Sequence, residues 1–453
     1  MRYFFNFLYR NCFIFLFFLS ALLAVWLRYD MSGKMYSIDE VFIIETIKLM
    51  FESGSLDTNV NKVFIATYNG AEHNQYAFSS YIVSASLWSQ LLQILVSEKI
   101  DLWIAVRIWG CVLDLATFLL VFSIGRIYSG RAVGLLAAFL YAISPTAVFE
   151  VHWIRPEVYM SFVATSILMA SLYMSRYFYT CTLLAAILSG AAFACKFTGL
   201  LLVLVPFIAL VYRPLPGIGL TFSRAASWLV LSVAGFVVGF GLSAPYALIN
   251  FEKFLWGIQY VFWQYGLGQP MGSSVYPELV NPVSDALQAY ILALGPFFCA
   301  MVVLAFWFGW RNKTERRNLV IIASTPIICL ASIVAQDQFG LRNISHAMPI
   351  LCILASAGSI GFYNRIIVNR KFAIAKFLAM IFLVASPSLV YSTLLVVGYM
   401  RGNEDESFIR YEQALMAEFP QKNLTVISSP DVWMLKFPEK NEGNIYRLDI
   451  QKD

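Results

Sequence analysis

The chain has 453 residues, of which 59% are hydrophobic and only 13% are charged. Soluble proteins average roughly 45 to 50% apolar and about 25% charged residues, so the composition excludes a soluble enzyme, and 16% aromatic residues exclude a disordered chain. The net charge of +5 comes from Lys and Arg scattered between apolar runs without a basic stripe, so nucleic acid is not an expected partner. A polytopic membrane protein remains.

Apolar runs divide the chain into about eleven candidate spans, each near the roughly 20 residues that a membrane helix needs. The first run, 12–26, follows Arg2 and Arg10 and lacks a small-residue cleavage site, which predicts an uncleaved signal anchor with a cytoplasmic N-terminus. The later runs are 104–125, 133–149, 158–175, 179–194, 198–212, 226–243, 288–308, 318–335, 346–362 and 375–398. The sequence thus predicts an all-α polytopic membrane domain over residues 1–399.

Segment 78–96, in which serines and glutamines interrupt the apolar residues, decides the orientation of everything after it. If it lies on the outer membrane surface, the short cytoplasmic connections collect Arg126, Arg131, Arg176, Arg213, Arg224, Arg311, Lys313, Arg316, Arg317, Arg365, Arg370, Lys371 and Lys376. If it spans, all of them face outside and the positive-inside rule is violated at each loop. We therefore expect an interfacial helix within a first outer loop over 28–103, with nearly all carboxylates outside.

Two other segments, 41–52 and 252–265, are amphipathic and are expected to lie flat on the same outer surface. In the first, Ile43, Ile44, Ile47 and Met50 recur at helical spacing. Residues 400–453 are charged, with a helical pattern at 407–419 and strand-like stretches at 423–428 and 432–437. They predict a small soluble extracytoplasmic α/β domain.

Asp39 and Glu40 follow the first span almost at once and begin an amphipathic helix. Two adjacent carboxylates at the outer surface suit a general base with its partner, or a cation site. The alternative is an ordinary helix N-terminus, because Ser37 can cap it and acids are favoured in the first turn.

A second constellation, Glu150, His152, Arg155 and Glu157, lies in the short loop FEVHWIRPEVYM. Arg155 and Glu157 could simply pair with each other, and a surface pair contributes little. Four polar groups between two membrane helices are nevertheless costly unless they face a cavity or water, which favours a site.

Lys196 and Arg342 are isolated outer cations beside apolar runs. Each suits a lipid phosphate, or else merely snorkels or anchors a helix. Asp114 falls inside a span, where an acid is either functional or hydrogen-bonded to another helix. The three histidines show no ligand spacing, so no metal ligands are assigned, although a divalent metal is possible.

The order of these motifs resembles the GT-C superfamily, in particular its protein-mannosyltransferase and aminoarabinose-transferase-like lipid-linked glycosyltransferases. Asp39-Glu40 follows the first helix, Arg155-Pro-Glu157 lies in the second outer loop, and Lys-Phe-Thr-Gly-Leu-Leu at 196–201 precedes an apolar run ending at Pro206. The likeness covers roughly residues 1–215 well and extends loosely to Arg342.

The resemblance implies a membrane enzyme that moves a sugar from a polyprenyl-phosphate carrier to a lipid, glycan or protein acceptor on the outer face, with inversion. By similarity, Asp39 is the general base, Glu40 orients it or the sugar, and Glu157 is the second acid. The cations that neutralise the departing phosphate would be Arg155, Lys196 and Arg342, with His152 and His346 as further substrate-binding residues.

Related transferases carry a phosphate-binding lysine before the third surface helix, where this chain reads HNQYAFSSY. Its role passes to one of the three cations above. Two other functions stay open, a secondary transporter and a surface-polysaccharide polymerase or ligase; the transporter class usually needs acids near the midplane and repeated halves. The expected location is the plasma (inner) membrane, with the C-terminus outside.

Overall fold

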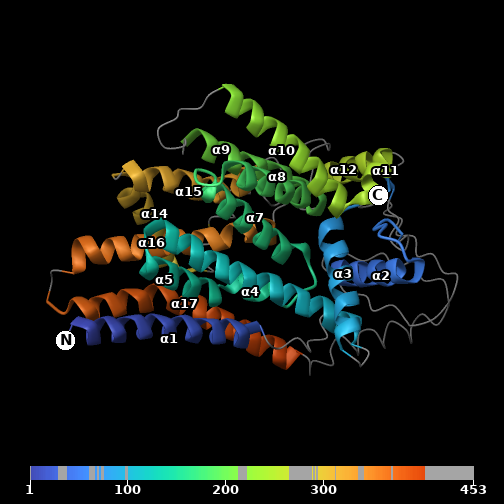
Figure 1. Cartoon of the computed structure of the whole chain (residues 1–453). Coiled ribbons are helices and arrows are strands. Elements are labelled where there is room, and N and C mark those ends of the chain that lie inside the picture. Colours follow the sequence, from blue (N-terminus) through green and yellow to red (C-terminus); the bar gives the residue numbers. More distant parts are fainter. Residues whose placement is uncertain are drawn as a thin grey trace, which may run out of the picture.

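The computed structural model is a bundle of long helices with shorter helices gathered at one end (Figure 1). It describes residues 2–28, 38–60, 67–68, 71–72, 76–96, 100–212, 222–264, 288, 291, 294–311, 313–334, 341–368 and 371–402. The predicted α/β domain over 400–453 thus lies almost wholly outside the described residues.

Each apolar run of the sequence coincides with helical structure wherever its residues are described. The long helices are α1 (Arg2–Arg28), α4 (Leu102–Ser129), α5 (Arg131–Ala142), α7 (Pro156–Tyr173), α8 (Phe178–Cys195), α10 (Phe222–Ser243), α14 (Pro296–Trp310), α15 (Lys313–Val334), α16 (Met348–Phe362) and α17 (Ala373–Gly402). Shorter elements are α6 (Pro145–Val151), the 3-10 helices η1 (Phe197–Val203) and η2 (Leu341–Ala347), α9 (Leu204–Tyr212), α11 (Pro245–Ile249) and the π-helical turn η3 (Tyr363–Ile367).

Among the described residues, 5 helical segments are long and apolar enough to cross a membrane, or up to 6 if the bent pair α5 and α6 forms one span. Three shorter apolar helical segments lie at Ile14–Arg28, Phe197–Tyr212 and Pro296–Trp310. The chain is therefore a helical multi-pass membrane protein, as its composition predicts.

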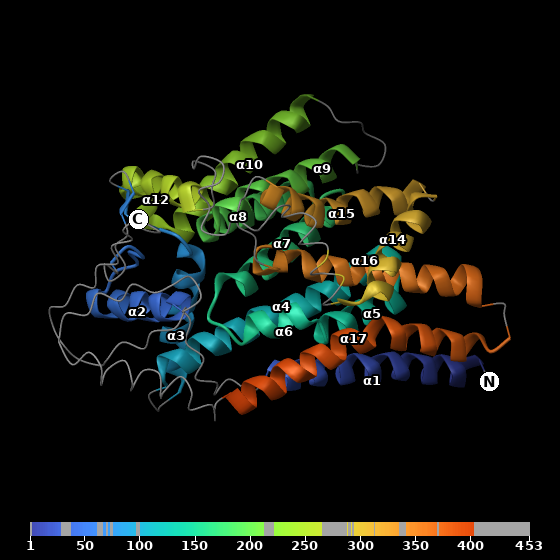
Figure 2. The same cartoon turned by 180° about the vertical axis from the view of Figure 1, so that it is seen from behind.

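Helices α2 (Ile38–Ser53), α3 (Ser79–Leu95) and α12 (Phe251–Gln264) lie at the end of the bundle away from the N-terminus (Figures 1 and 2). A two-residue pairing of β1 (Thr67–Tyr68) with β2 (Ala71–Glu72) accompanies them. The predicted apolar face of α2 is confirmed, because Ile43, Ile44, Ile47 and Met50 are all buried.

Helix α3 runs across this end of the bundle, transverse to the long helices in both views (Figures 1 and 2). Its serines face inward: Ser80 Oγ donates to the carbonyl oxygen of Ala191 on α8, at 2.5 Å. Its outward face is mixed: leucines and Ile94 are exposed, and so are Gln90 and Gln93. The buried serines therefore lie inside the protein, and the outward face keeps the mixture of apolar and polar residues expected of a helix at the membrane surface.

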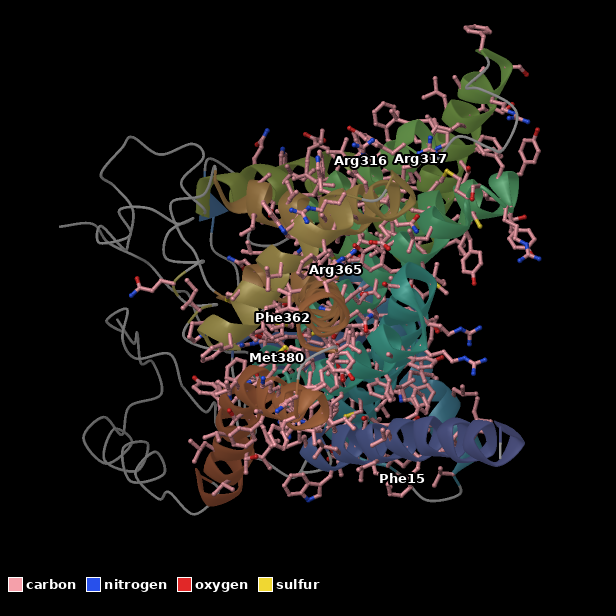
Figure 3. The ribbon with its side chains drawn as sticks, turned by 90° about the vertical axis from the view of Figure 1, so that its left-hand side faces the viewer. Phe15, Arg316, Arg317, Phe362, Arg365 and Met380 are labelled. Carbon is pink, nitrogen blue, oxygen red and sulfur yellow. The ribbon has the colours of Figure 1, made fainter. Side chains whose placement is uncertain are left out.

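The opposite end of the bundle carries arginines, as Figure 3 shows for Arg316, Arg317 and Arg365. Arg365 stacks on the ring of Phe308 at 4.6 Å, and Arg316 lies 5.7 Å from the ring of Trp310. Cations over aromatic faces suit a membrane–water boundary. Basic residues that the sequence places in two of the short connections thus lie together at this end of the bundle.

Helices α8 and α10 pack so closely that two glycines are required between them. A Cβ atom at Gly239 would overlap the carbonyl oxygen of Ile187, and one at Gly190 would overlap that of Phe236. Small residues of this kind let membrane helices approach through van der Waals contact alone. The close pairing fixes the end of α8, where Lys196 follows.

Candidate functional site

Three acid- and cation-bearing segments meet at the end of the bundle that holds α2, α3 and α12: the first turn of α2, the loop from Glu150 to Glu157, and the end of α8. The start of α16 joins them through η2. The sequence motifs are far apart along the chain, so helix packing brings them together.

Glu40 is fully buried and joins α2 to the second loop. Its Oε1 accepts a hydrogen bond from the backbone N–H of Ile154 at 2.7 Å. The same oxygen lies 3.6 Å from Nη2 of Arg107 on α4, and both side chains are buried. A buried carboxylate with a cation and an N–H donor is compensated, so Glu40 holds the two segments in register.

Glu157 forms an ion pair with Lys196, whose Nζ lies 2.8 Å from its Oε1. Glu157 stands in the first turn of α7, and Lys196 follows the last residue of α8. Each charge is at the helix end that the peptide dipoles favour. The side chain of Lys196 is 16% exposed and that of Glu157 4%, so the lysine remains the more accessible partner.

Arg155 and His152 flank this pair in the same loop. The guanidinium of Arg155 stacks on the ring of Trp153, 4.4 Å from its centroid. Nδ1 of His152 lies 2.6 Å from the carbonyl oxygen of Val148 in α6. The ion pair of Glu157 is thus with Lys196, and Arg155 has an aromatic partner in Trp153.

His346 is buried at the end of η2, close enough to Lys196 and Glu157 for both charges to act on its ring. The structure therefore brings together Glu157, Lys196 and His346, predicted separately from the sequence. The side chains of Asp39 and Arg342 lie outside the described residues; their backbones belong to α2 and η2.

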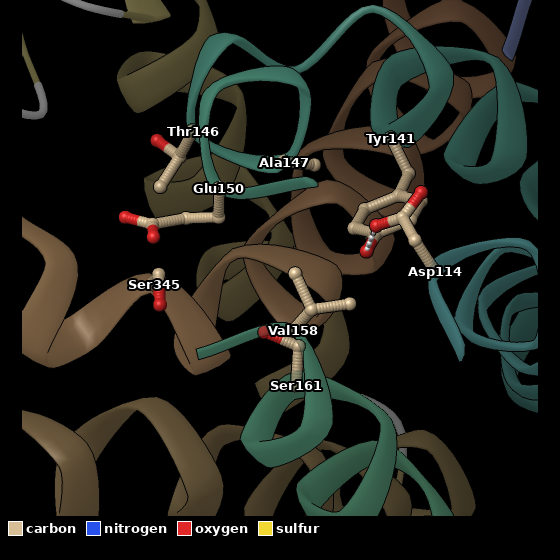
Figure 4. Close-up of a pocket in the computed structure, with 8 residues that line it drawn as sticks. All are labelled: Asp114, Tyr141, Thr146, Ala147, Glu150, Val158, Ser161 and Ser345. Carbon is tan, nitrogen blue, oxygen red and sulfur yellow. Dashed lines mark hydrogen bonds between the residues drawn. The ribbon is translucent and has the colours of Figure 1, made fainter. Parts of the chain in front are cut away.

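Glu150 is buried and lines a polar pocket with room for about one water molecule. In Figure 4, Glu150 and Thr146 stand opposite Ser345, while Asp114 and Tyr141 are hydrogen-bonded to each other on the other side. The full lining is Asp114, Tyr141, Thr146, Ala147, Glu150, Val158, Ser161 and Ser345. This pocket joins the loop to the interior of the bundle.

The carboxylate of the interior acid Asp114 has two partners inside the bundle. It is ion-paired with Arg28, the last residue of α1, and accepts a hydrogen bond from Tyr141 Oη at 2.5 Å. The predicted alternative, a structural bond to another helix, is what the structure shows.

Sequence reasoning missed Arg28, Arg107 and Tyr81. Arg107 interrupts an apolar run as Asp114 does, so the rule that singled out Asp114 could have found it. Tyr81 on α3 is buried close to Glu40; burial, and after it the Glu40 charge, raises the pKa of the Tyr81 hydroxyl, which stays neutral. No pattern in the sequence marks it.

The start of α3 is docked on the end of α8 beside Lys196. The backbone N–H of Phe78 donates to the carbonyl oxygen of Cys195 at 3.1 Å. Nearby, Asn250 Nδ2 donates to Tyr76 Oη at 3.0 Å and ties the start of α12 to the same corner. Burial raises the pKa of the Tyr76 hydroxyl, so it remains a neutral acceptor.

Within the described part of the chain, no three His, Cys, Asp or Glu side chains are grouped as metal ligands would be. The acids that are brought together face cations instead: Arg107 for Glu40, Lys196 for Glu157 and Arg28 for Asp114. Such an arrangement can hold an anion by exchanging a carboxylate for a phosphate at the accessible cation.

No protein-family model matches the sequence, and no curated protein matches it. Solved structures do match its fold. ArnT from Cupriavidus metallidurans, bound to undecaprenyl phosphate, aligns with a TM-score of 0.58 at 16% identity over 91% of this chain and 81% of its own. The Archaeoglobus fulgidus oligosaccharyltransferase in the apo form gives 0.57 at 14% identity, over 94% of this chain and 62% of its own.

A second structure of the Archaeoglobus fulgidus protein, AglB in complex with an inhibitory peptide and a dolichol-phosphate, gives a TM-score of 0.52 at 13% identity over 95% of this chain. This chain spans 62% of the length of that protein. The neighbours are lipid-linked glycosyltransferases of the GT-C superfamily, so the resemblance stated from the sequence is confirmed at the level of the fold.

Proposed function

We propose that this chain is an integral-membrane glycosyltransferase that moves a sugar from a polyprenyl-phosphate carrier to an acceptor hydroxyl at the end of the bundle formed by α2, α3 and α12. The fold supports a glycosyltransferase of this general kind, because one neighbour was solved with undecaprenyl phosphate and another with a dolichol-phosphate. The acceptor would be a lipid, a glycan or a protein.

The observation that carries the proposal is the Glu157–Lys196 pair. A lysine that is 16% exposed, at the end of a membrane helix and beside a buried acid, offers a point charge to a lipid phosphate at the interface. Because Glu157 shares this charge when no phosphate is present, Lys196 costs little to keep at the membrane surface. Arriving phosphate would replace the carboxylate as its partner.

In the proposed reaction Asp39 takes the proton of the acceptor hydroxyl, and the oxygen attacks the anomeric carbon of the sugar. The bond from that carbon to the phosphate oxygen breaks, its electron pair stays on the phosphate, and configuration inverts. Lys196, Arg155 and Arg342 neutralise the departing lipid phosphate, which is the larger electrostatic contribution. His152 and His346 would contact substrate.

Glu40 would act on Asp39 indirectly. It fixes the first turn of α2, on which Asp39 also lies, by its bonds to Ile154 and Arg107. A side chain so deeply buried is better suited to orientation than to proton transfer. We therefore assign Glu40 to positioning of the base and Glu157 to the second acid of the site.

The same proposal includes an eleven-span topology with a cytoplasmic N-terminus and an extracytoplasmic C-terminus in the plasma (inner) membrane. Arginines at one end and the acid-bearing loops at the other support this orientation. The membrane domain would cover residues 1–399, and residues 400–453 would form a small outer domain. A transporter would need a titrating midplane acid, and Asp114 is held by Arg28 and Tyr141.

The experiment is sugar transfer by the purified protein in lipid vesicles, from a radiolabelled pool of polyprenyl-phosphate sugars to co-reconstituted cell-envelope acceptors. We expect transfer by the wild type and a loss of roughly 10²- to 10⁴-fold in Asp39→Asn. Glu45→Gln, an exposed acid on the same helix, is the matched control and should retain full transfer. Equal transfer by Asp39→Asn would exclude Asp39 as base; no wild-type transfer from any polyprenyl donor would refute the function.

A further inference from the structure

The bundle contains a break between α5 and α6, where the chain bends by 53°. Backbone carbonyls at such a break have no partner within their helix, and inside a membrane they must be satisfied by other groups. Arg28 Nη1 donates to the carbonyl oxygen of Ala142 at 2.8 Å. Ser392 Oγ on α17 donates to that of Ile143, also at 2.8 Å.

The side chain of Arg28 has several partners of its own. Its guanidinium pairs with Asp114, which Tyr141 also contacts, and its Nη1 reaches back to the carbonyl oxygen of Ala24 at 3.1 Å. Only 2% of the residue is exposed. A planar guanidinium with five donors in a fixed fork can serve a carboxylate and several carbonyls at once, which a lysine cannot.

The bend that Arg28 holds lies directly before the second loop in the chain. α6 follows the bend after Ala142, and the loop that carries Glu150 to Glu157 continues from α6. Ile154 of this loop donates its backbone N–H to Glu40 on α2. The position of the bend therefore bears on where the loop meets α2.

We propose that Arg28 and Asp114 are positioning residues for the transfer reaction: together they fix the bend between α5 and α6 from which the second loop continues, and so set the place of that loop against α2. The inference rests on the proposed function, since it names what holds that site in register. Asp114 and Tyr141 line the same pocket as Glu150, so the cluster and the loop border one cavity (Figure 4).

If the Arg28–Asp114 pair only stabilised the protein, removing both charges together would leave the exchange of residues 150–157 and kcat unchanged. Buried ion pairs are often no more stabilising than apolar residues of similar size, provided both charges are removed together. The double variant Arg28→Met/Asp114→Asn leaves no lone buried charge and should fold, but it also removes the donor to the Ala142 carbonyl. Ser392→Ala removes only the other donor to the break and is a milder second test.

The experiment combines two readouts on each variant, reconstituted in vesicles. Hydrogen exchange measures protection of the peptide covering residues 150–157, which includes the Ile154 amide, and transfer assays separate kcat from KM for the polyprenyl-phosphate sugar pool. Thr393→Ala is the control, because the Thr393 hydroxyl bonds only within α17, to Leu389, at 2.8 Å.

In the double variant we expect exchange of 150–157 to rise about tenfold and kcat to fall about 10²-fold with KM within about twofold, since misplacement by 1 Å can cost that much. Ser392→Ala should shift both in the same direction by less, and Thr393→Ala neither. Unchanged exchange at 150–157, or raised exchange with unchanged kcat, would overturn the inference. If the wild type transfers no sugar, the proposed function fails while the exchange result still decides whether the cluster positions the loop.

Discussion

Replacing Lys196 with methionine tests the proposed phosphate site most directly, because methionine keeps an unbranched side chain of nearly the same length and removes its charge. The lysine is 2.8 Å from Glu157, whose side chain is 4% exposed. Breaking one partner of a buried pair costs about 3–5 kcal/mol of stability. Losing one preorganised group that stabilises transition-state charge costs about 10²- to 10³-fold in kcat. Lys196→Met should therefore lose both stability and transfer.

The double variant Lys196→Met/Glu157→Gln separates the two effects, since it leaves no lone carboxylate. We expect its thermal stability to return towards wild type while transfer stays at or below the level of Lys196→Met. Binding of undecaprenyl phosphate, measured by native mass spectrometry, should weaken in both, whereas Glu157→Gln alone should tighten it by removing the competing carboxylate. Recovery of transfer in the double variant, or wild-type lipid-phosphate binding by Lys196→Met, would show that Lys196 serves only to neutralise Glu157.

Three further outcomes are expected. Glu40→Ala should destabilise the protein by about 3–5 kcal/mol, because Arg107 loses its buried carboxylate, while Glu40→Gln keeps an acceptor and should cost less; thermal unfolding in detergent compares them, and equal losses would contradict the reasoning. Gly239→Leu should abolish folded yield because its side chain would enter the backbone of Ile187, whereas Gly110→Ala, with open space around its Cβ position, should be tolerated or stabilising by up to about 1 kcal/mol. Chelation by EDTA should leave transfer unchanged, because Glu40 and Glu157 are already compensated by cations; a loss restored by Mg²⁺ or Mn²⁺ would place a metal in the reaction.

The helices and the segments that carry the site could be predicted from the sequence, because apolar run length and helical spacing act locally. The buried face of α2 is an example: Ile43 and Ile47 are both at 0% exposure, as their spacing predicts. The partners could not be predicted. Asp114 pairs with Arg28, which lies at the end of another helix, where the sequence suggests only an ordinary flanking charge. The packing of α7 against α8 decides which of the outer cations faces Glu157.

Hydropathy is also a poor guide to which face of a helix meets lipid where polar side chains bond to the backbone. The serines of α3 suggest contact with headgroups, yet Ser89 bonds within its own helix and Ser80 to α8, so these serines lie inside while Gln90 and Gln93 stay exposed. A serine that satisfies itself against a carbonyl costs little in an apolar setting. Orientation of such a helix follows from the charge of the loops beyond it, and only packing shows which face meets lipid.

The charge balance of the site bears on how a turnover would end. A lipid phosphate held by unshared cations would leave slowly, because each charge-assisted bond persists in a low-dielectric setting. In the proposed cycle Lys196 leaves Glu157 when the phosphate binds and pairs with Glu157 again when the phosphate leaves. Binding and release are therefore opposite exchanges of the same partners. Glu40 and Asp114 have no such freedom, since their cations are buried with them. Among these three pairs, the one with an accessible member is thus the one placed where the carrier would arrive and depart.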